Sequence, residues 1–72
     1  MRIENHLRVF RRRRGYTLKE LSRISGISVS EISSIENGAI RDPGIYVCSV
    51  LARALEAEIS EIFELMDGER RI

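Results

Sequence analysis

The chain has 72 residues and a formal net charge of +1, with 43% hydrophobic and 32% charged residues. This composition is typical of one small soluble globular domain. No apolar run approaches the roughly 20 residues of a membrane-spanning helix. The first ten residues, MRIENHLRVF, lack the apolar stretch of a secretory signal, so we expect a cytoplasmic protein. A single cysteine excludes an internal disulfide.

The charges are divided unevenly along the chain. Residues 1–41 hold nine Lys and Arg against four acidic residues, a balance of +5, whereas residues 42–72 hold three Arg against seven acidic residues, a balance of −4. A basic half joined to an acidic half indicates that one face meets a polyanion while the other avoids it. Two solvated charge faces of a helical domain are the alternative explanation.

The first predicted helix covers residues 3–14. Ile3, Leu7 and Phe10 form one apolar stripe at helical spacing. Arg11 lies at the edge of this stripe, which predicts a partly buried and paired side chain. The remaining arginines of the run are expected to be solvated or to face phosphates; they are Arg12, Arg13 and Arg14.

The next segment, residues 17–38, predicts two short helices joined at Gly26. Thr17 with Glu20, and Ser28 with Glu31, have the spacing of capping boxes, in which each side chain satisfies a backbone N–H of the other residue. Gly26 stands where a helix ends in a left-handed conformation. Two capped helices joined at a glycine predict a helix-turn-helix, whose second helix is free to enter a major groove. The apolar positions of the two helices and their turn are expected to face each other; they are Leu21, Ile27, Ile32 and Ile35.

Two further helices are predicted after a loop. Asp42 and Pro43 have the pattern of an N-cap followed by the first helical residue, which predicts a helix over residues 43–56. Apolar residues at helical spacing predict a last helix over residues 59–66, and residues 67–72 form a short charged tail. No strand pattern is evident. The predicted fold is therefore a compact all-α domain of five helices over residues 1–66.

Residue types that carry catalysis or bind metals are sparse. His6 has no Asp or Cys at ligand spacing, and Cys48 falls on an apolar helix face as a small buried hydrophobe. Glu58, Glu61 and Glu64 are expected to form a solvated face. No phosphate-binding glycine loop, zinc spacing or nucleophile–base pair is present. We therefore expect no enzyme activity, no cofactor, no metal and no small-molecule ligand.

The ordered series of motifs resembles the lambda repressor/Cro-type helix-turn-helix domain, also called the XRE family. The resemblance covers about residues 3–63. It is carried by Leu7-Arg8-x-x-Arg11-x-x-x-Gly15, Thr17-x-x-Glu20-Leu21, Gly26-Ile27-Ser28, Ile32-Ser33-x-Ile35-Glu36-Asn37-Gly38, Pro43, Leu51-Ala52-x-Ala54-Leu55 and Ile62-Phe63. Each motif alone is common, and the specificity comes from their order across some sixty residues.

The resemblance implies roles for individual residues. The helix near residues 28–37 would lie in the major groove and contact base edges through Val29, Ser30, Ser33 and Ser34. Phosphate contacts are expected from a larger set, which is Thr17, Leu18, Lys19, Ser28, Asn37, Arg41, Arg12 and Arg13. The resemblance also implies a structural ion pair between Arg11 and Glu36, which agrees with the edge position of Arg11.

Several positions depart from the family pattern. Leu18 stands where Gln is frequent, Ser25 stands where an apolar residue is usual, and Glu56 replaces a frequent Gly. The packing of the turn and the last connection are therefore expected to differ. The reading helix has no Arg, Lys, Gln or Asn before Asn37, and those side chains make the bidentate base contacts. Glu31 is expected to cap its helix rather than to read a cytosine.

These observations predict sequence-specific binding to double-stranded DNA by a small transcriptional regulator, most simply a repressor. Direct readout is expected to be modest, and DNA shape or a dimer on two half-sites would add specificity. The resemblance implies a homodimer formed through the C-terminal helices. The alternative is a protein-interaction module, such as an antitoxin or anti-repressor, which acts mainly through a protein partner.

Overall fold

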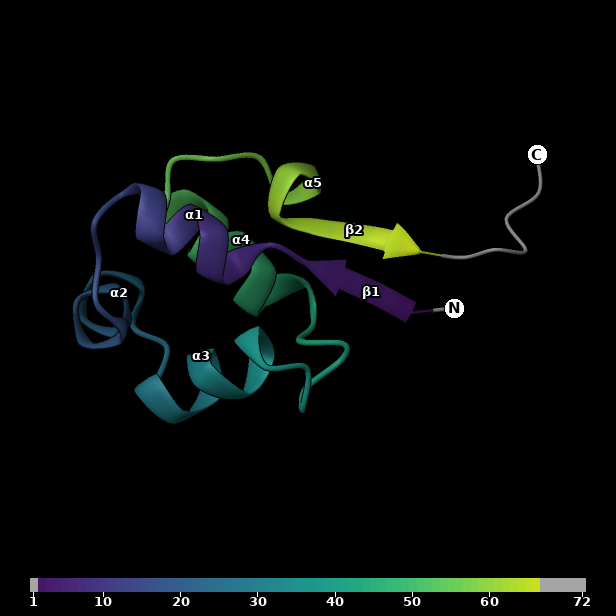
Figure 1. Cartoon of the computed structure of the whole chain (residues 1–72), viewed down its shortest axis with the longest axis horizontal. Helices are drawn as coiled ribbons and strands as arrows, with labels where there is room; N and C mark the ends of the chain where they lie inside the picture. The colour runs from purple at the N-terminus through teal and green to yellow at the C-terminus, as the bar shows by residue number, and fades with distance from the viewer. Residues whose placement is uncertain (1, 67–72) are drawn as a thin grey trace.

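The computed structural model describes residues 2–66, so the expected charged tail at residues 67–72 lies outside the described residues. The elements in chain order are β1 (Arg2–Asn5), α1 (Leu7–Arg13), α2 (Leu18–Ser25), α3 (Val29–Glu36), α4 (Ile45–Ala54), α5 (Ile59–Ile62) and β2 (Phe63–Met66). The helices form one body, and the two strands form a ribbon that extends from one end of it (Figure 1). The five expected helices are present, although the bounds of several differ from the prediction.

The five helices share one hydrophobic core. Every helix and the connections beside them contribute buried apolar side chains; the buried set is Leu7, Leu21, Ile27, Ile32, Ile35, Cys48, Leu51, Ala52, Leu55, Ile62 and Phe63. The four apolar positions expected to face each other in the helix-turn-helix all belong to this set. Cys48 is a buried free thiol, and burial raises its pKa. This core fixes α3 through one face, which leaves the opposite face for function.

The turn between α2 and α3 has the expected geometry. Gly26 ends α2 in the left-handed region, with a φ of 80°, and its N–H donates to the Ser22 carbonyl at 2.8 Å. The Ser25 hydroxyl accepts from the Ile27 N–H at 3.1 Å, so the unusual serine satisfies a backbone donor of the turn. Ile24 remains about half exposed and does not take the place of the missing apolar residue.

The prediction was wrong at the two ends of the domain, where helix was expected and strands are found. β1 and β2 pair antiparallel, with Asn5 opposite Phe63 and Arg2 opposite Met66. The His6 N–H continues the pairing by donating to the Ile62 carbonyl at 2.7 Å. Helix α1 begins only at Leu7, whose N–H donates to the Asn5 side chain at 3.1 Å. Short apolar segments do not distinguish helix from strand by periodicity alone, so the ribbon had no clear sequence signal.

The predicted start of α4 was also wrong. The helix begins at Ile45 rather than Pro43, and its N-cap is Gly44, with a φ of 90°. The Asp42 carboxylate instead accepts from the Gly44 N–H at 3.3 Å, which closes a local turn before the helix. The pattern of Asp followed by Pro therefore marks a turn, and the helix begins two residues after Pro43.

Glu56 takes a left-handed conformation in the connection between α4 and α5. Its φ is 55°, and it is the one non-glycine residue of the described chain with a positive φ. The position where a glycine is frequent thus keeps the backbone geometry that glycine favours. The Glu56 carboxylate accepts from Arg14 at 3.1 Å, and Arg14 also donates to the Leu55 carbonyl. These contacts tie the end of α1 to the last connection.

Candidate nucleic-acid interface

Helix α3 has one buried and one open side. Ile32 and Ile35 lie in the core, whereas Ser28, Val29 and Ser30 are exposed. In Figure 1 this helix forms the lower edge of the molecule, and no described segment lies below it. The first turn of α3 is therefore accessible along its outer side, which is what a helix needs to enter a groove.

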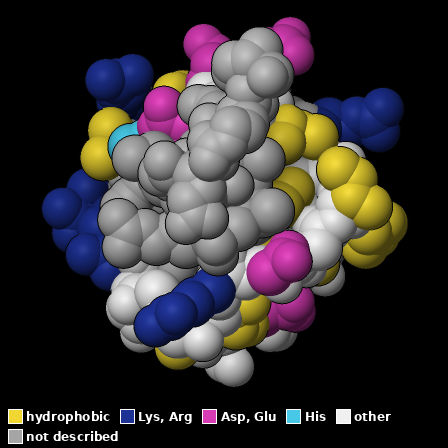
Figure 2. Space-filling view, turned by 90° about the vertical axis from the view of Figure 1, so that its right-hand side faces the viewer, with side chains coloured by type: hydrophobic (Ala, Val, Ile, Leu, Met, Phe, Trp, Pro, Cys, Tyr) yellow, Lys and Arg dark blue, Asp and Glu magenta, His cyan; other side chains and the backbone are white. Residues whose placement is uncertain are grey.

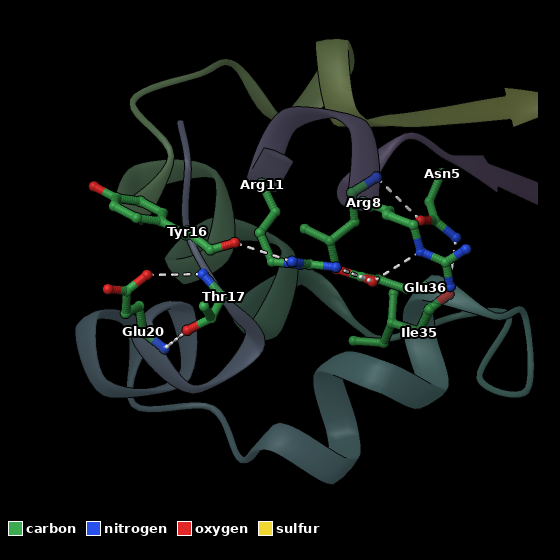
Figure 3. Close-up of polar contacts among 9 residues, drawn as sticks. Asn5, Arg8, Arg11, Tyr16, Thr17, Glu20, Ile35 and Glu36 are labelled. Carbon is green, nitrogen blue, oxygen red and sulfur yellow. Dashed lines mark hydrogen bonds and ion pairs between the residues drawn. The ribbon is translucent and has the colours of Figure 1, made fainter. Parts of the chain in front are cut away.

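The two helices of the motif are capped unequally. At α2 the capping box is complete: the Thr17 hydroxyl accepts from the Glu20 N–H at 3.0 Å, and the Glu20 carboxylate accepts from the Thr17 N–H at 2.8 Å (Figure 3). At α3 only half of the predicted box forms. The Ser28 hydroxyl accepts from the Glu31 N–H at 3.1 Å, but no reciprocal bond from the Ser28 N–H to the Glu31 carboxylate is present among the described contacts. The expected capping role of the Glu31 side chain is therefore wrong.

The residues expected to contact bases follow the open side of α3. Val29 has 38% of its surface exposed, Ser30 is exposed, and Ser33 and Ser34 are half-buried. The first turn therefore offers the most accessible side chains, and access decreases toward the middle of the helix. Their chemistry is plain: one branched methyl pair and three hydroxyls, which bond to many base edges.

The residues expected to contact phosphates fall around the ends of α2 and α3. Lys19, Asn37 and Arg41 are exposed. Leu18 is partly buried against the core, so only its backbone N–H, at the first position of α2, is suited to a phosphate. The Asn37 side chain accepts from the Ala39 N–H at 3.0 Å, which leaves its amide NH₂ as the donor group.

Arg12 and Arg13 lie in the last turn of α1, and both are exposed. The Arg13 guanidinium lies 5.2 Å from the centre of the Phe10 ring, a cation–π distance. Their phosphate role stays a prediction, because α1 ends away from the first turn of α3 in Figure 1.

Glu36 at the end of α3 binds two arginines of α1. Arg11 donates from Nε to one carboxylate oxygen at 2.7 Å and from Nη2 to the other at 3.0 Å, and its Nη1 donates to the Tyr16 carbonyl at 3.0 Å. Arg8 donates from Nε to Glu36 at 3.1 Å. Figure 3 shows both guanidinium groups converging on the carboxylate. Arg11 and Glu36 thus form the ion pair that the resemblance implies, and Arg8, to which the resemblance assigned no role, joins it.

This cluster is buried at its centre. The exposed fraction is 2% for the Glu36 side chain and 48% for the Arg8 side chain. Burial by itself would raise the pKa of Glu36, but hydrogen bonds and positive charge from Arg11 and Arg8 hold that pKa below its usual value. The hydrogen bond to Glu36 raises the pKa of Arg11. The cluster therefore holds one carboxylate and two arginines in their charged forms.

Two residues near α3 were missed by sequence reasoning. Arg8 precedes Arg11 by three residues and therefore shares its helix face, a spacing that could have identified it. Asn5 donates from Nδ2 to the Ile35 carbonyl at 2.9 Å and links β1 to the last turn of α3. No sequence signal identified Asn5, because its role depends on the ribbon. Together these contacts fix the C-terminal end of α3 to α1 and β1.

Basic and apolar side chains are both exposed on the surface seen from the ribbon end. In that view most Lys and Arg side chains lie at the left and lower margins, with a further basic group at the upper right, and the largest group of hydrophobic side chains lies on the right (Figure 2). Two adjacent apolar residues at the start of α4 are strongly exposed, Ile45 by 73% and Tyr46 by 71%. Within residues 2–66, no helix has the length and apolarity to cross a bilayer, and no three His, Cys, Asp or Glu residues gather to hold a metal ion.

Comparison with known proteins agrees with this geometry. A family model described as helix-turn-helix matches residues 7–62. The HTH-type transcriptional regulator SlrR of Bacillus subtilis (strain 168) is 34% identical over 58 residues, which cover 81% of this chain. The matched region is 38% of SlrR, so the chain corresponds to little more than a third of that relative. Domains of this family are typically non-enzymatic and bind DNA. The chain belongs to the lambda repressor/Cro-type (XRE) helix-turn-helix family.

Proposed function

We propose that this protein binds double-stranded DNA sequence-specifically, with α3 in the major groove, and acts as a transcriptional regulator. The observation that carries the proposal is the open outer side of α3, where Ser28, Val29 and Ser30 are exposed while Ile32 and Ile35 anchor the helix in the core. A helix held this way presents its N-terminal residues to base edges without disturbing the fold. The regulatory role of the relative SlrR supports the same conclusion.

Affinity in this proposal comes mainly from the phosphate backbone. Exposed cations lie in the first turn of α2, at Lys19, and in the loop that follows α3, at Arg41, and the N-terminus of α2 adds backbone N–H donors. Phosphate contacts release counterions, so the affinity falls steeply with salt. A flat salt response would contradict this part of the proposal.

Specificity in this proposal depends on few base contacts. Val29 offers its methyl groups to a thymine methyl, and Ser30 and Ser34 offer hydroxyls that accept several base edges. Such a surface discriminates weakly in one half-site. We infer that the protein binds as a homodimer through its C-terminal elements, so that two half-sites and the shape of the DNA between them supply the remaining discrimination.

A matched pair of substitutions tests whether α3 enters the groove. Ser30→Glu places a negative side chain on the open side of α3. Ile24→Glu places the same side chain at the end of α2, where Ile24 is 49% exposed and lies beside Val50 and Arg53 of α4. Sequences bound by the wild-type protein are first selected from a random DNA pool. Ser30→Glu is expected to weaken binding to the selected site by tenfold or more, and Ile24→Glu to leave it unchanged. Equal affinities for both variants, with both folded by circular dichroism, would refute the placement of α3.

The alternative function is a protein-interaction module. It is favoured by the adjacent exposed side chains of Ile45 and Tyr46, because contiguous apolar residues on a surface mark contact sites. Light scattering combined with a gel shift against random DNA separates the two functions. A stable monomer that binds no DNA at low salt would support the module and contradict the proposed regulator.

A further inference from the structure

We propose that Arg8 is a further DNA phosphate-contacting residue, held by Glu36 beside the C-terminal end of α3. This inference rests on the proposed DNA binding and extends the contact surface from α3 to the first turns of α1. Arg8 was not among the expected contact residues.

The geometry of Arg8 leaves its terminal nitrogens available. Its Nε donates to Glu36 at 3.1 Å, which fixes the guanidinium near the carboxylate. Among residues 5–64, whose side chains the structure describes, no hydrogen bond from either Nη atom of Arg8 is found, and 48% of the side chain is exposed. Arg11, by contrast, uses Nε and both Nη atoms for contacts inside the protein. Each Nη of Arg11 keeps a second N–H, but only 10% of the Arg11 side chain is exposed, so Arg8 offers the donors that are accessible to an external anion.

The charge of the cluster favours an anion. One carboxylate, Glu36, lies between two guanidinium groups, so the cluster carries one net positive charge, and the exposed part of that charge is on Arg8. A guanidinium fixed at one nitrogen loses less side-chain freedom when a phosphate binds at the other two. Glu36 therefore holds the Arg8 guanidinium in position without neutralising the positive charge of the cluster.

The location of the cluster agrees with a phosphate contact. Glu36 is the last residue of α3 and is followed by the exposed Asn37, an expected phosphate contact. Lys and Arg side chains gather on the left of Figure 2, which is the side that faces the viewer in Figure 1, and α1 lies on that side. Because Glu36 binds Arg8 and is followed directly by Asn37, Arg8 and Asn37 both lie at the C-terminal end of α3.

The test measures how DNA affinity depends on salt in three variants. Arg8→Gln removes the charge, Arg8→Lys keeps it, and Arg53→Gln removes an exposed charge on α4 as the matched control. Each phosphate contact contributes about 0.9 to the slope of log K against log salt. Between 50 and 200 mM salt, the affinity of Arg8→Gln should therefore fall about 3.5-fold less than that of the wild type. Arg8→Lys and Arg53→Gln should keep the wild-type slope.

The outcomes separate this inference from the function on which it rests. Loss of binding by the wild type itself would overturn the proposed DNA binding. Wild-type binding with an unchanged slope in Arg8→Gln would overturn only the role of Arg8, and a lowered melting temperature alone would show that Arg8 serves the fold. Should Arg8→Gln not fold, a wild-type slope in the uncharged but flexible variant Arg8→Met would overturn the inference equally.

Discussion

Removing the charge of Glu36 tests how the reading helix is fixed to the rest of the domain. Only 2% of the Glu36 side chain and 10% of the Arg11 side chain are exposed, so Glu36→Gln leaves a buried guanidinium without its carboxylate. Breaking a buried ion pair at one partner costs about 3–5 kcal/mol. In a domain of this size each kcal/mol lowers the melting temperature by about 4–8 °C. The free energy of unfolding, from urea denaturation, should therefore fall by about 3–5 kcal/mol, a large fraction of the roughly 5–15 kcal/mol that is typical of a native domain.

The control for this experiment is an exposed ion pair of the same charge type. Glu56 pairs with Arg14 at 3.1 Å, and both side chains are exposed, so Glu56→Gln should change the free energy of unfolding by less than about 1 kcal/mol. A loss of that small size in Glu36→Gln as well would show that solvent screens the cluster, and the account of a rigid attachment would then be wrong. In a double-mutant cycle with Arg11→Met, the two losses should overlap by more than about 1 kcal/mol.

Three further predictions concern the same fold. Because the pKa of Glu36 is lowered in the folded state, the stabilisation from its charge is present above pH 4.5, the ordinary pKa of a glutamate, and is lost as the pH falls below that value. Urea midpoints measured between pH 7 and 3 should show this loss in the wild type and a smaller loss in Glu36→Gln. Gly26→Ala should cost about 1–2 kcal/mol from backbone strain alone, since a Cβ there meets no atom within 4 Å; thermal melts check it, and an unchanged midpoint contradicts it. Glu56→Gly should stabilise the domain by up to about 1 kcal/mol by relieving the positive φ, and a destabilised variant would show that its bond to Arg14 contributes more.

The sequence predicted the helix-turn-helix well because its signals are local. The Thr17 capping box, the left-handed Gly26 and the buried apolar positions each depend on residues a few positions apart. The ion pair between Arg11 and Glu36 lies as the resemblance implies. In each case a few neighbouring residues determine where a helix begins, where it ends and which side it buries, and a single sequence contains that information.

The features that the sequence did not predict depend on pairing between distant segments. β1 and β2 join the two ends of the described chain, and no local pattern distinguishes four residues of strand from one turn of helix. Asn5 acquires its bond to the Ile35 carbonyl only after that pairing places it beside α3. The start of α4 was misplaced for a different reason, because Asp42 closes a turn before the helix instead of capping it.

The structure attaches α3 firmly while giving it few side chains that discriminate between bases. Its C-terminal end is held by Arg11, Arg8 and Asn5, which come from α1 and β1. Its open side offers Val29 and hydroxyl groups. These groups distinguish bases poorly if the helix can shift to fit each sequence. A helix fixed in one orientation rejects DNA whose groove width or phosphate spacing does not fit. In the proposed complex with DNA, rigid attachment would therefore allow the open side of α3 to select its site by shape, and loosening the Glu36 cluster should relax selectivity more than it reduces affinity for random DNA.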